Sequence, residues 1–212
     1  MNSAAGKGDV MANFACREAP LRVAVMYHFW PHYRQAVMQA MDGSRAITYD
    51  FYGSGEPLEG VPHAALNAVA RFKRVPFYRV CNLVWQAQAI RVACSGRYDA
   101  LVMLADPHFA STWIAALCAK LRRTPVLFWG HGWLRKEHGI QRAIRRLYYA
   151  LSTRFLTYSE RGKDLGVAAG HAPHAITVVY NSLDVARADA VIAAIEAGAL
   201  TNERPQQYFA DH

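Results

Sequence analysis

His131 stands between Gly130 and Gly132 in the segment FWGHGW, and this setting suits a residue that meets a ligand. Glycines let the chain turn sharply and bring its backbone close to a ligand. A histidine in such a turn can act as a base or donate a hydrogen bond to a phosphate. The other interpretation is a capping or core histidine at the end of a buried strand, and spacing alone leaves both open. Arg135 and Lys136 follow, and a His, Arg and Lys set at a helix entrance is the composition an anion site needs.

Two further segments carry polar side chains that could contact a ligand. The segment HFWPHYRQ begins at His28; its aromatic residues around a proline suit a sugar or acyl platform, and Arg34 could meet a phosphate. A packing loop is the alternative there. Asp106, in LADPHF, could orient a hydroxyl or cap the following helix. The segment GSGEP at 53–57 lacks the lysine and spacing of a phosphate loop and the glycine pattern of a dinucleotide fingerprint, so it predicts a flexible turn.

Apolar stretches between these segments predict the strands and helices that position them. Runs rich in valine and aromatics predict strands at 21–29, 45–55, 99–104, 125–130, 154–159 and 175–181. Further stretches predict helices at 33–44, 84–97, 109–123, 140–151, 160–168 and 183–198. Strands separated by helices indicate βαβ units, and apolar strands without polar alternation indicate burial on both faces. The prediction is an α/β fold with a single Rossmann-like, doubly wound parallel sheet, in which residues 56–82 are unassigned.

The carboxyl ends of the strands in such a sheet form the edge at which ligands bind. His28, Asp106 and His131 each lie at or just after the end of a predicted strand. We therefore interpret His131 as a site residue rather than a core residue.

The chain is basic, with 24 lysines and arginines against 16 aspartates and glutamates and a formal net charge of +8. Such a charge favours an anionic partner: nucleic acid, acidic lipid or a phosphorylated substrate. No nucleic-acid-binding module signature is present, so we expect no nucleic-acid partner. No apolar run is as long as a transmembrane helix, residues 1–20 lack a secretory signal, and the four cysteines lack metal-ligand spacing. We expect a cytoplasmic protein with a disordered leader at 1–20 and no metal.

The predicted helix at 140–151 has an apolar stripe formed by Ile140, Ile144, Leu147 and Leu151, with arginines beside it. One interpretation is a helix packed on the sheet with a solvated basic rim. The other is attraction to an anionic membrane surface, with arginines and tyrosines at the level of the headgroups.

The order of these pieces resembles the amino-terminal half of GT-B glycosyltransferases, particularly the retaining family 4 type. The resemblance rests on HGW, the basic helix, FLTYSERGKDLGVAAG and ITVVYNSLD. In VVYNSLD, Ser182 and Leu183 stand where the family commonly has glycine and valine. The resemblance spans residues 21–190, and residues 128–184 carry most of it.

The resemblance implies a Rossmann-like acceptor-binding domain at 21–183, followed by a helix and tail at 184–212 that lead toward a donor-binding domain. His131 would be the catalytic residue of this half and would face the donor phosphates or the transferred sugar. Acceptor-binding roles are implied for His28, Tyr33, Arg34, Asp106, Gly130, Gly132, Arg135 and Lys136, and interdomain positions for Asn181 and Asp184.

The donor-binding half that the resemblance calls for has no counterpart in these 212 residues. We therefore expect a fragment, a truncated protein or one half of a split enzyme, inactive without a donor-binding domain or subunit. The complete enzyme would transfer a sugar from a nucleotide-sugar donor to a saccharide or lipid-linked acceptor of the cell envelope, and this half would bind no cofactor of its own. A peripheral position at the inner face of the membrane is expected for such an acceptor. The alternative is a non-catalytic binding or scaffold protein that uses its basic face on a membrane or partner.

Overall fold

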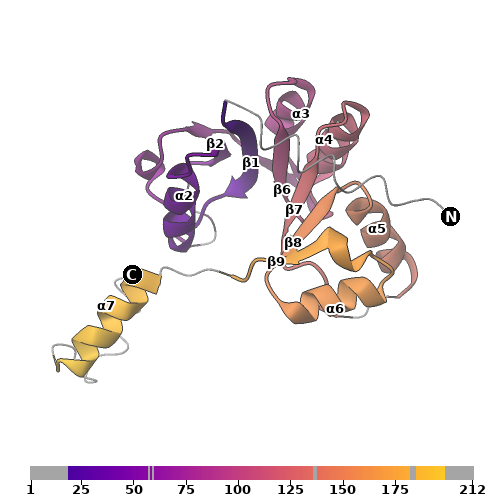
Figure 1. Ribbon diagram of the computed structural model, residues 1–212. Helices are drawn as coiled ribbons and strands as arrows, with labels where there is room; N and C mark the ends of the chain where they lie inside the picture. Colours follow the sequence, from indigo (N-terminus) through magenta and orange to yellow (C-terminus); the bar gives the residue numbers. More distant parts are fainter. Residues whose placement is uncertain (1–18, 57, 59, 136–137, 182–184, 199–212) are drawn as a thin grey trace.

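A seven-stranded parallel sheet with the order β3-β2-β1-β6-β7-β8-β9 forms the centre of the molecule (Figure 1). The computed structural model describes residues 19–198 except 57, 59, 136–137 and 182–184. The seven strands are β1 (Leu21–Phe29), β2 (Ile47–Ser54), β3 (Phe72–Arg74), β6 (Ala100–Leu104), β7 (Val126–Gly130), β8 (Arg154–Thr157) and β9 (Ile176–Val178). A separate antiparallel hairpin joins β4 (Tyr78–Val80) to β5 (Leu83–Trp85). The parallel, doubly wound sheet confirms the predicted fold class.

Helices connect the strands and cover both faces of the sheet. They are α2 (Gln35–Asp42), α3 (Ala87–Cys94), α4 (Ala110–Leu121), α5 (Gly139–Tyr149) and α6 (Glu160–Ala168). The last described helix, α7 (Val185–Glu196), follows β9 and lies away from the sheet (Figure 1). Short 3-10 helices lie at His32–Arg34, Leu66–Ala68 and Pro173–Ala175. Among the described residues, no helix is both long enough and apolar enough to cross a bilayer.

The topology changes direction at β1, which pairs in parallel with β2 on one side and with β6 on the other. The chain first builds outward through β2 and β3, and then crosses back to build through β6 to β9. At such a switch point the connections leave in opposite directions, and a crevice opens at the carboxyl ends of the strands. The ends of β1 and β6 therefore mark where a ligand site should lie.

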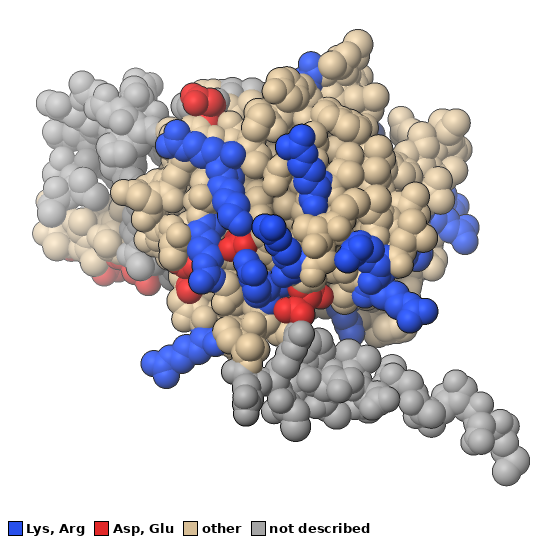
Figure 2. Space-filling view, turned by 90° about the horizontal axis from the view of Figure 1, so that it is seen from above, with Lys and Arg blue, Asp and Glu red and all other residues tan. Residues whose placement is uncertain are grey.

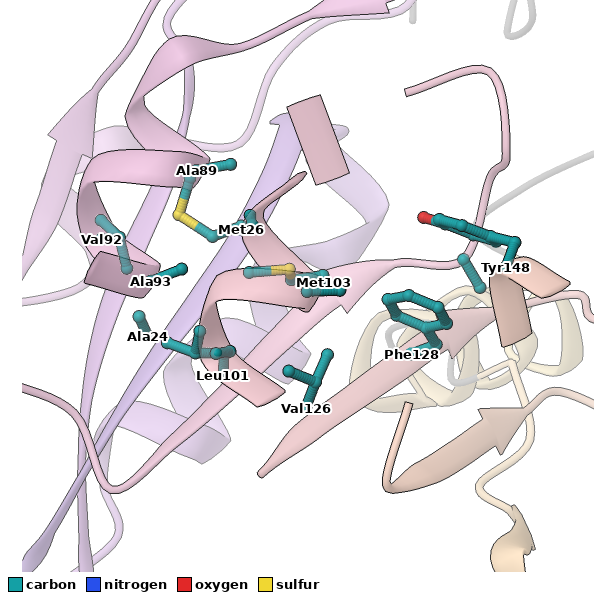
Figure 3. Close-up of a cluster of buried hydrophobic side chains, with 14 of the residues drawn as sticks. Ala24, Met26, Ala89, Val92, Ala93, Leu101, Met103, Val126, Phe128 and Tyr148 are labelled. Atoms are coloured by element: carbon teal, nitrogen blue, oxygen red, sulfur yellow. The ribbon is translucent and has the colours of Figure 1, made fainter. Parts of the chain in front are cut away.

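The core consists of two layers, one on each face of the sheet. In β1, Ala24 and Met26 point into the layer under α3, α4, α5 and α6, whereas Val23 and Val25 point into the layer that includes α2. Figure 3 shows the first layer, in which Phe128 and other strand side chains lie among those of α3 and α5. Because both faces of the strands are buried, their sequences are continuous apolar runs without polar alternation.

The layer on the α2 face is only partly covered. A groove of about 540 Å³ lies between α2 and the strands, lined by Val37 and Met41 of the helix and by Val102, Leu127 and Leu156 of the sheet. One face of the sheet thus has four helices over it, while the other keeps an open apolar groove.

The interpretation in which the apolar stripe packs on the sheet holds only for Leu151, which follows α5 and packs against the core. Ile140, Ile144 and Leu147 are 76%, 45% and 64% exposed, whereas Tyr148 and Tyr149 are buried. The tyrosines occupy the sheet side because their rings fill more space and their hydroxyls donate to the carbonyls of Leu104 and Ala105, at 3.1 and 3.4 Å.

Residues 56–82 contain β3 and β4, which the sequence analysis did not assign. Each of these strands has only three residues, too few for an alternating pattern to be visible. The segment GSGEP also differs from the predicted flexible turn, because β2 continues to Ser54 and Gly53 packs against the Trp30 indole.

Candidate functional site

A cleft of about 470 Å³ lies at the carboxyl ends of β1, β6, β7 and β8, beside the switch point. Seven of the residues predicted for the site line it: His28, Tyr33, Arg34, Asp106, Gly130, His131 and Asn181. They come from four separate segments of the chain (28–34, 106, 130–131 and 181), and the parallel sheet brings them to one edge. Their functional roles remain predictions, but their proximity is a property of the fold.

Arg34 is the most constrained polar side chain of the cleft. Its side chain is only 6% exposed, and its guanidinium carbon lies 5.0 Å from the Trp129 ring centroid and 4.9 Å from that of Tyr158. Nη2 donates to the amide oxygen of Asn181 at 3.0 Å, whereas Nη1 is buried without a hydrogen-bond partner among the described residues. A buried guanidinium with an unused donor, in the wall of a cleft, is suited to an anionic or polyol oxygen.

His131 is exposed, so the interpretation as a core histidine is wrong. Its ring meets the Tyr158 ring edge-on at 4.9 Å, and its carbonyl accepts a hydrogen bond from the Thr157 hydroxyl at 3.2 Å. Gly132 follows with φ +70°, a conformation that favours glycine. The turn therefore fixes the backbone of His131 while its imidazole stays open to a ligand.

Tyr158 is a central residue of the cleft that the sequence analysis missed. It contacts Arg34 and His131, and its hydroxyl lies 3.2 Å from that of Tyr27, which also lies 3.2 Å from the Trp129 carbonyl. Burial raises the pKa of Tyr27 well above its usual value, and the neighbouring Tyr158 adds to the shift, so Tyr27 remains a neutral phenol. The signal for Tyr158 was its position at the carboxyl end of the strand predicted at 154–159, next to Ser159 and Glu160.

Asp106 and His28 extend the cleft toward the β4–β5 hairpin. Both also line an adjoining pocket of about 430 Å³ that includes Arg79 and Asn82. The carboxylate of Asp106 accepts a hydrogen bond from the backbone N–H of His108, and it lies 2.8 Å from Nδ1 of that histidine. Asp106 does not cap α4, which begins at Ala110 without a side-chain cap. It is therefore oriented by His108 at the junction of the two pockets.

Other predicted site residues lie elsewhere. Gly132 packs against Phe155 and Thr157 and serves the turn. Arg135 lines a different pocket, between α5 and α6, so it does not form one anion site with His131 as the spacing suggested. Lys136 and Asp184 lie outside the described residues. Within the part of the chain that the structure describes, no group of three His, Cys, Asp or Glu side chains is placed to hold a metal ion.

The cleft thus combines a fixed cation, an open imidazole and an oriented carboxylate. The cation and the imidazole suit phosphate or sugar oxygens, and the carboxylate suits a hydroxyl. An imidazole open to a ligand can also transfer a proton near neutral pH.

No protein-family model and no curated protein matches this chain. Solved structures do match its fold. The Staphylococcus aureus MnaA–UDP structure superposes with a TM-score of 0.54 and 10% identity over 74% of this chain and 44% of its own. UDP-N-acetylglucosamine 2-epimerase from Rickettsia bellii gives 0.50 and 11%, over 87% and 50% of the two chains. HepE (Alr3699) of Anabaena in complex with UDP gives 0.51 and 12%, over 85% and 50%.

This chain spans about half the length of these solved structures. At such low identities the likeness concerns the fold alone. Together with the strand order, it shows that the parallel sheet and its flanking helices have a Rossmann-like α/β fold like that of these structures.

Proposed function

We propose that this chain is the acceptor-binding domain of a glycosyltransferase that acts together with a donor-binding domain or subunit. The reaction would move a sugar from a nucleotide-sugar donor to a saccharide or lipid-linked acceptor. The observation that carries the proposal is the cleft at the switch point, which is lined by a buried arginine and an exposed histidine that both contact Tyr158. Two of the similar structures hold UDP, and a third is named for a UDP-sugar epimerase, which agrees with chemistry on nucleotide sugars.

Each cleft residue has a role in this proposal. Asp106 and His28 would bind acceptor hydroxyls, since both lie where the two pockets meet. Arg34, held by Asn181, would bind a phosphate or sugar oxygen with its free Nη1. His131 would face the reaction centre. It would stabilise the charge that develops on the leaving diphosphate, or accept the proton that the acceptor hydroxyl loses.

The surface of the molecule supports a membrane-linked acceptor. Figure 2 shows a face, seen from above Figure 1, on which lysines and arginines gather around a few acidic side chains. Residues 78–85, 110–123 and 139–150, which include the β4–β5 hairpin, α4 and α5, contain no aspartate or glutamate. Large apolar side chains are exposed on the same elements: Tyr78, Val80, Leu83, Trp85, Ile114, Leu117, Leu121, Ile140, Ile144 and Leu147. Exposed apolar groups with cations and without anions suit an anionic membrane surface.

The same surface favours the second candidate function, a non-catalytic scaffold that binds a membrane or a partner protein. Reconstitution separates the two. The chain would be used as bait, and a complex stable in size-exclusion chromatography would be assayed for transfer from UDP-sugars. The expected result is no turnover by the chain alone and measurable turnover by a complex whose second chain contains a nucleotide-sugar domain.

The matched variant for this assay is His131→Ala. Because the imidazole is exposed, its loss should change the free energy of unfolding by less than about 0.5 kcal/mol. Transfer by the complex should fall by at least roughly a hundredfold, the usual contribution of a positioned acid or base. Turnover by the isolated chain, or full activity of the variant complex, would contradict the proposal.

A further inference from the structure

A second pocket, of about 250 Å³, lies between α5 and α6. Four arginines and two histidines line it: Arg135, His138, Arg142, Arg145, Arg146 and His171. Its remaining lining is apolar, and no aspartate or glutamate of the described residues takes part. Six side chains that carry or can carry positive charge thus share one small concavity.

Trp133 forms the floor of this pocket and holds the two helices at a fixed distance. Its indole is 5% exposed and lies 4.8 Å from the His171 ring. A Cβ at Gly166 of α6 would come within 2.6 Å of the indole, so the glycine lets α6 lie directly on Trp133. The floor of the pocket is therefore fixed by close packing between Trp133 and α6.

The arginines of α5 that line this pocket lie close enough together to repel one another. The guanidinium of Arg145 donates to the carbonyl of Gly132 at 3.3 Å and to the Tyr149 hydroxyl at 2.9 Å. Arg142 and Arg146 lie one helical turn apart, a spacing at which like charges destabilise a helix. An anion between them would turn this repulsion into two attractions.

His171 adds a directional group. Its Nε2 is buried without a hydrogen-bond partner among the described residues. Burial lowers the pKa of His171, and the charge of Arg146 lowers it further. An unpaired buried nitrogen costs free energy that a ligand oxygen would recover.

We propose that this pocket binds a phosphate group with two negative charges, as in a phosphate monoester or a diphosphate. Arginine forks match the oxygens of phosphate, and the small volume fits a compact anion better than a whole nucleotide. The phosphate could belong to a free phosphorylated compound or to a lipid headgroup. Ile140 at the start of α5 is 76% exposed, so this apolar side chain is free to contact a membrane beside the pocket. Binding to a lipid headgroup can therefore be tested with vesicles. The inference does not depend on the proposed glycosyl transfer.

Titration calorimetry with inorganic pyrophosphate at low salt tests the proposal. Wild type should bind with saturation at one site. The Arg142→Ala, Arg146→Ala double variant should bind at least roughly tenfold more weakly for each lost charge-assisted hydrogen bond. The control is Arg91→Ala with Arg97→Ala, which removes two exposed arginines of the α3 region outside the pocket. The control should bind within about twofold of wild type, because distant exposed charges are screened.

NMR of the histidine side chains gives a second readout. Pyrophosphate should raise the pKa of His171, because a dianion stabilises the imidazolium. The side-chain resonances of His174, which lies outside the pocket, should not move on addition of pyrophosphate. Melting curves of both double variants should match wild type, since all four arginines are exposed.

Vesicles distinguish the two sources of the phosphate. Vesicles with phosphatidate, a monoester, are compared with phosphatidylglycerol, a diester, at equal surface charge. If the protein binds pyrophosphate but not phosphatidate vesicles, the ligand is a free phosphorylated compound. If it binds phosphatidate vesicles selectively, and this binding depends on Arg142 and Arg146, the ligand is a lipid headgroup. Either result supports the site. The proposal fails if neither probe saturates, if His171 does not respond, or if both double variants lose binding equally.

Discussion

Burial of Arg34 lowers the stability of the fold but places its guanidinium in the wall of the cleft. Its guanidinium is buried between two aromatic rings, and no described carboxylate lies within ion-pair distance. Burying a charge without a carboxylate costs several kcal/mol, and the cation–π contacts and the hydrogen bond to Asn181 offset this cost only in part. A residue kept under these conditions is more readily explained by ligand binding than by stability.

Arg34→Met tests this at the residue scale. Methionine fills much of the same space without a charge, so the free energy of unfolding should stay within about 1 kcal/mol of wild type or rise. Binding of an anionic ligand in the cleft should be lost, and Arg34→Lys should restore it only in part because lysine lacks the planar fork. Urea unfolding and titration of a sugar phosphate measure the two effects. A loss of stability above about 3 kcal/mol would mean that Arg34 is chiefly structural.

At the scale of elements, α5 has three different sides. Tyr148 and Tyr149 contact the core, Arg142 and Arg146 line the pocket next to α6, and the apolar stripe with Ile144 faces outward. An amphipathic helix normally buries its aliphatic stripe. In α5 the stripe is exposed instead, and it belongs to the surface that we propose for membrane contact.

Ile144→Glu separates binding from folding at this scale. Ile144 is 45% exposed, so the substitution should change the free energy of unfolding by less than about 0.5 kcal/mol. Binding to anionic vesicles in a sedimentation assay should fall, because the glutamate removes apolar contact and adds repulsion. Tyr148→Ala is the control for a loss of folding. Tyr148 is fully buried, so this substitution should lower the free energy of unfolding by about 3–5 kcal/mol. Unchanged vesicle binding by the glutamate variant would exclude α5 from the membrane contact.

For the whole molecule, one buried polar network joins the first three strands of the sheet. Asp50 of β2 is 2% exposed and accepts hydrogen bonds from Tyr98 at 2.6 Å and from Lys73 and Arg22 at 3.2 Å. Burial raises the pKa of Asp50, but the hydrogen bonds from Tyr98 and Lys73 and the charges of Lys73 and Arg22 outweigh it. The net pKa is below the usual value.

The lowered pKa of Asp50 predicts an acid-sensitive fold. The stabilisation is complete above about 3.9, the usual pKa of an aspartate in unfolded chains, and is lost as the pH falls through the lower folded value. Asp50→Asn should cost about 1–3 kcal/mol at neutral pH and flatten this acid dependence. Urea unfolding between neutral pH and pH 2 measures it, with the exposed Asp164→Asn as control. Equal acid dependence in wild type and Asp50→Asn would refute the assignment.

Much of the fold could be predicted from the sequence because it depends on local patterns. The strand at 21–29 coincides with β1, and the alternation of apolar strands with helices indicated a doubly wound parallel sheet. The position of His131 after a strand was sufficient to place it at the carboxyl edge of the sheet, because parallel strands all end there.

Tertiary structure alone decided which of these residues meet. Arg34 and Asn181 are 147 positions apart and form a hydrogen bond, whereas His131 and Arg135 are close in sequence and line different pockets. Sequence periodicity shows which residues share a face of one element, but not which element covers that face, so the outward stripe of α5 could not be foreseen. Local propensity and patterning thus determined the elements and their order, while packing between distant segments decided the contents of the cleft and created the basic pocket.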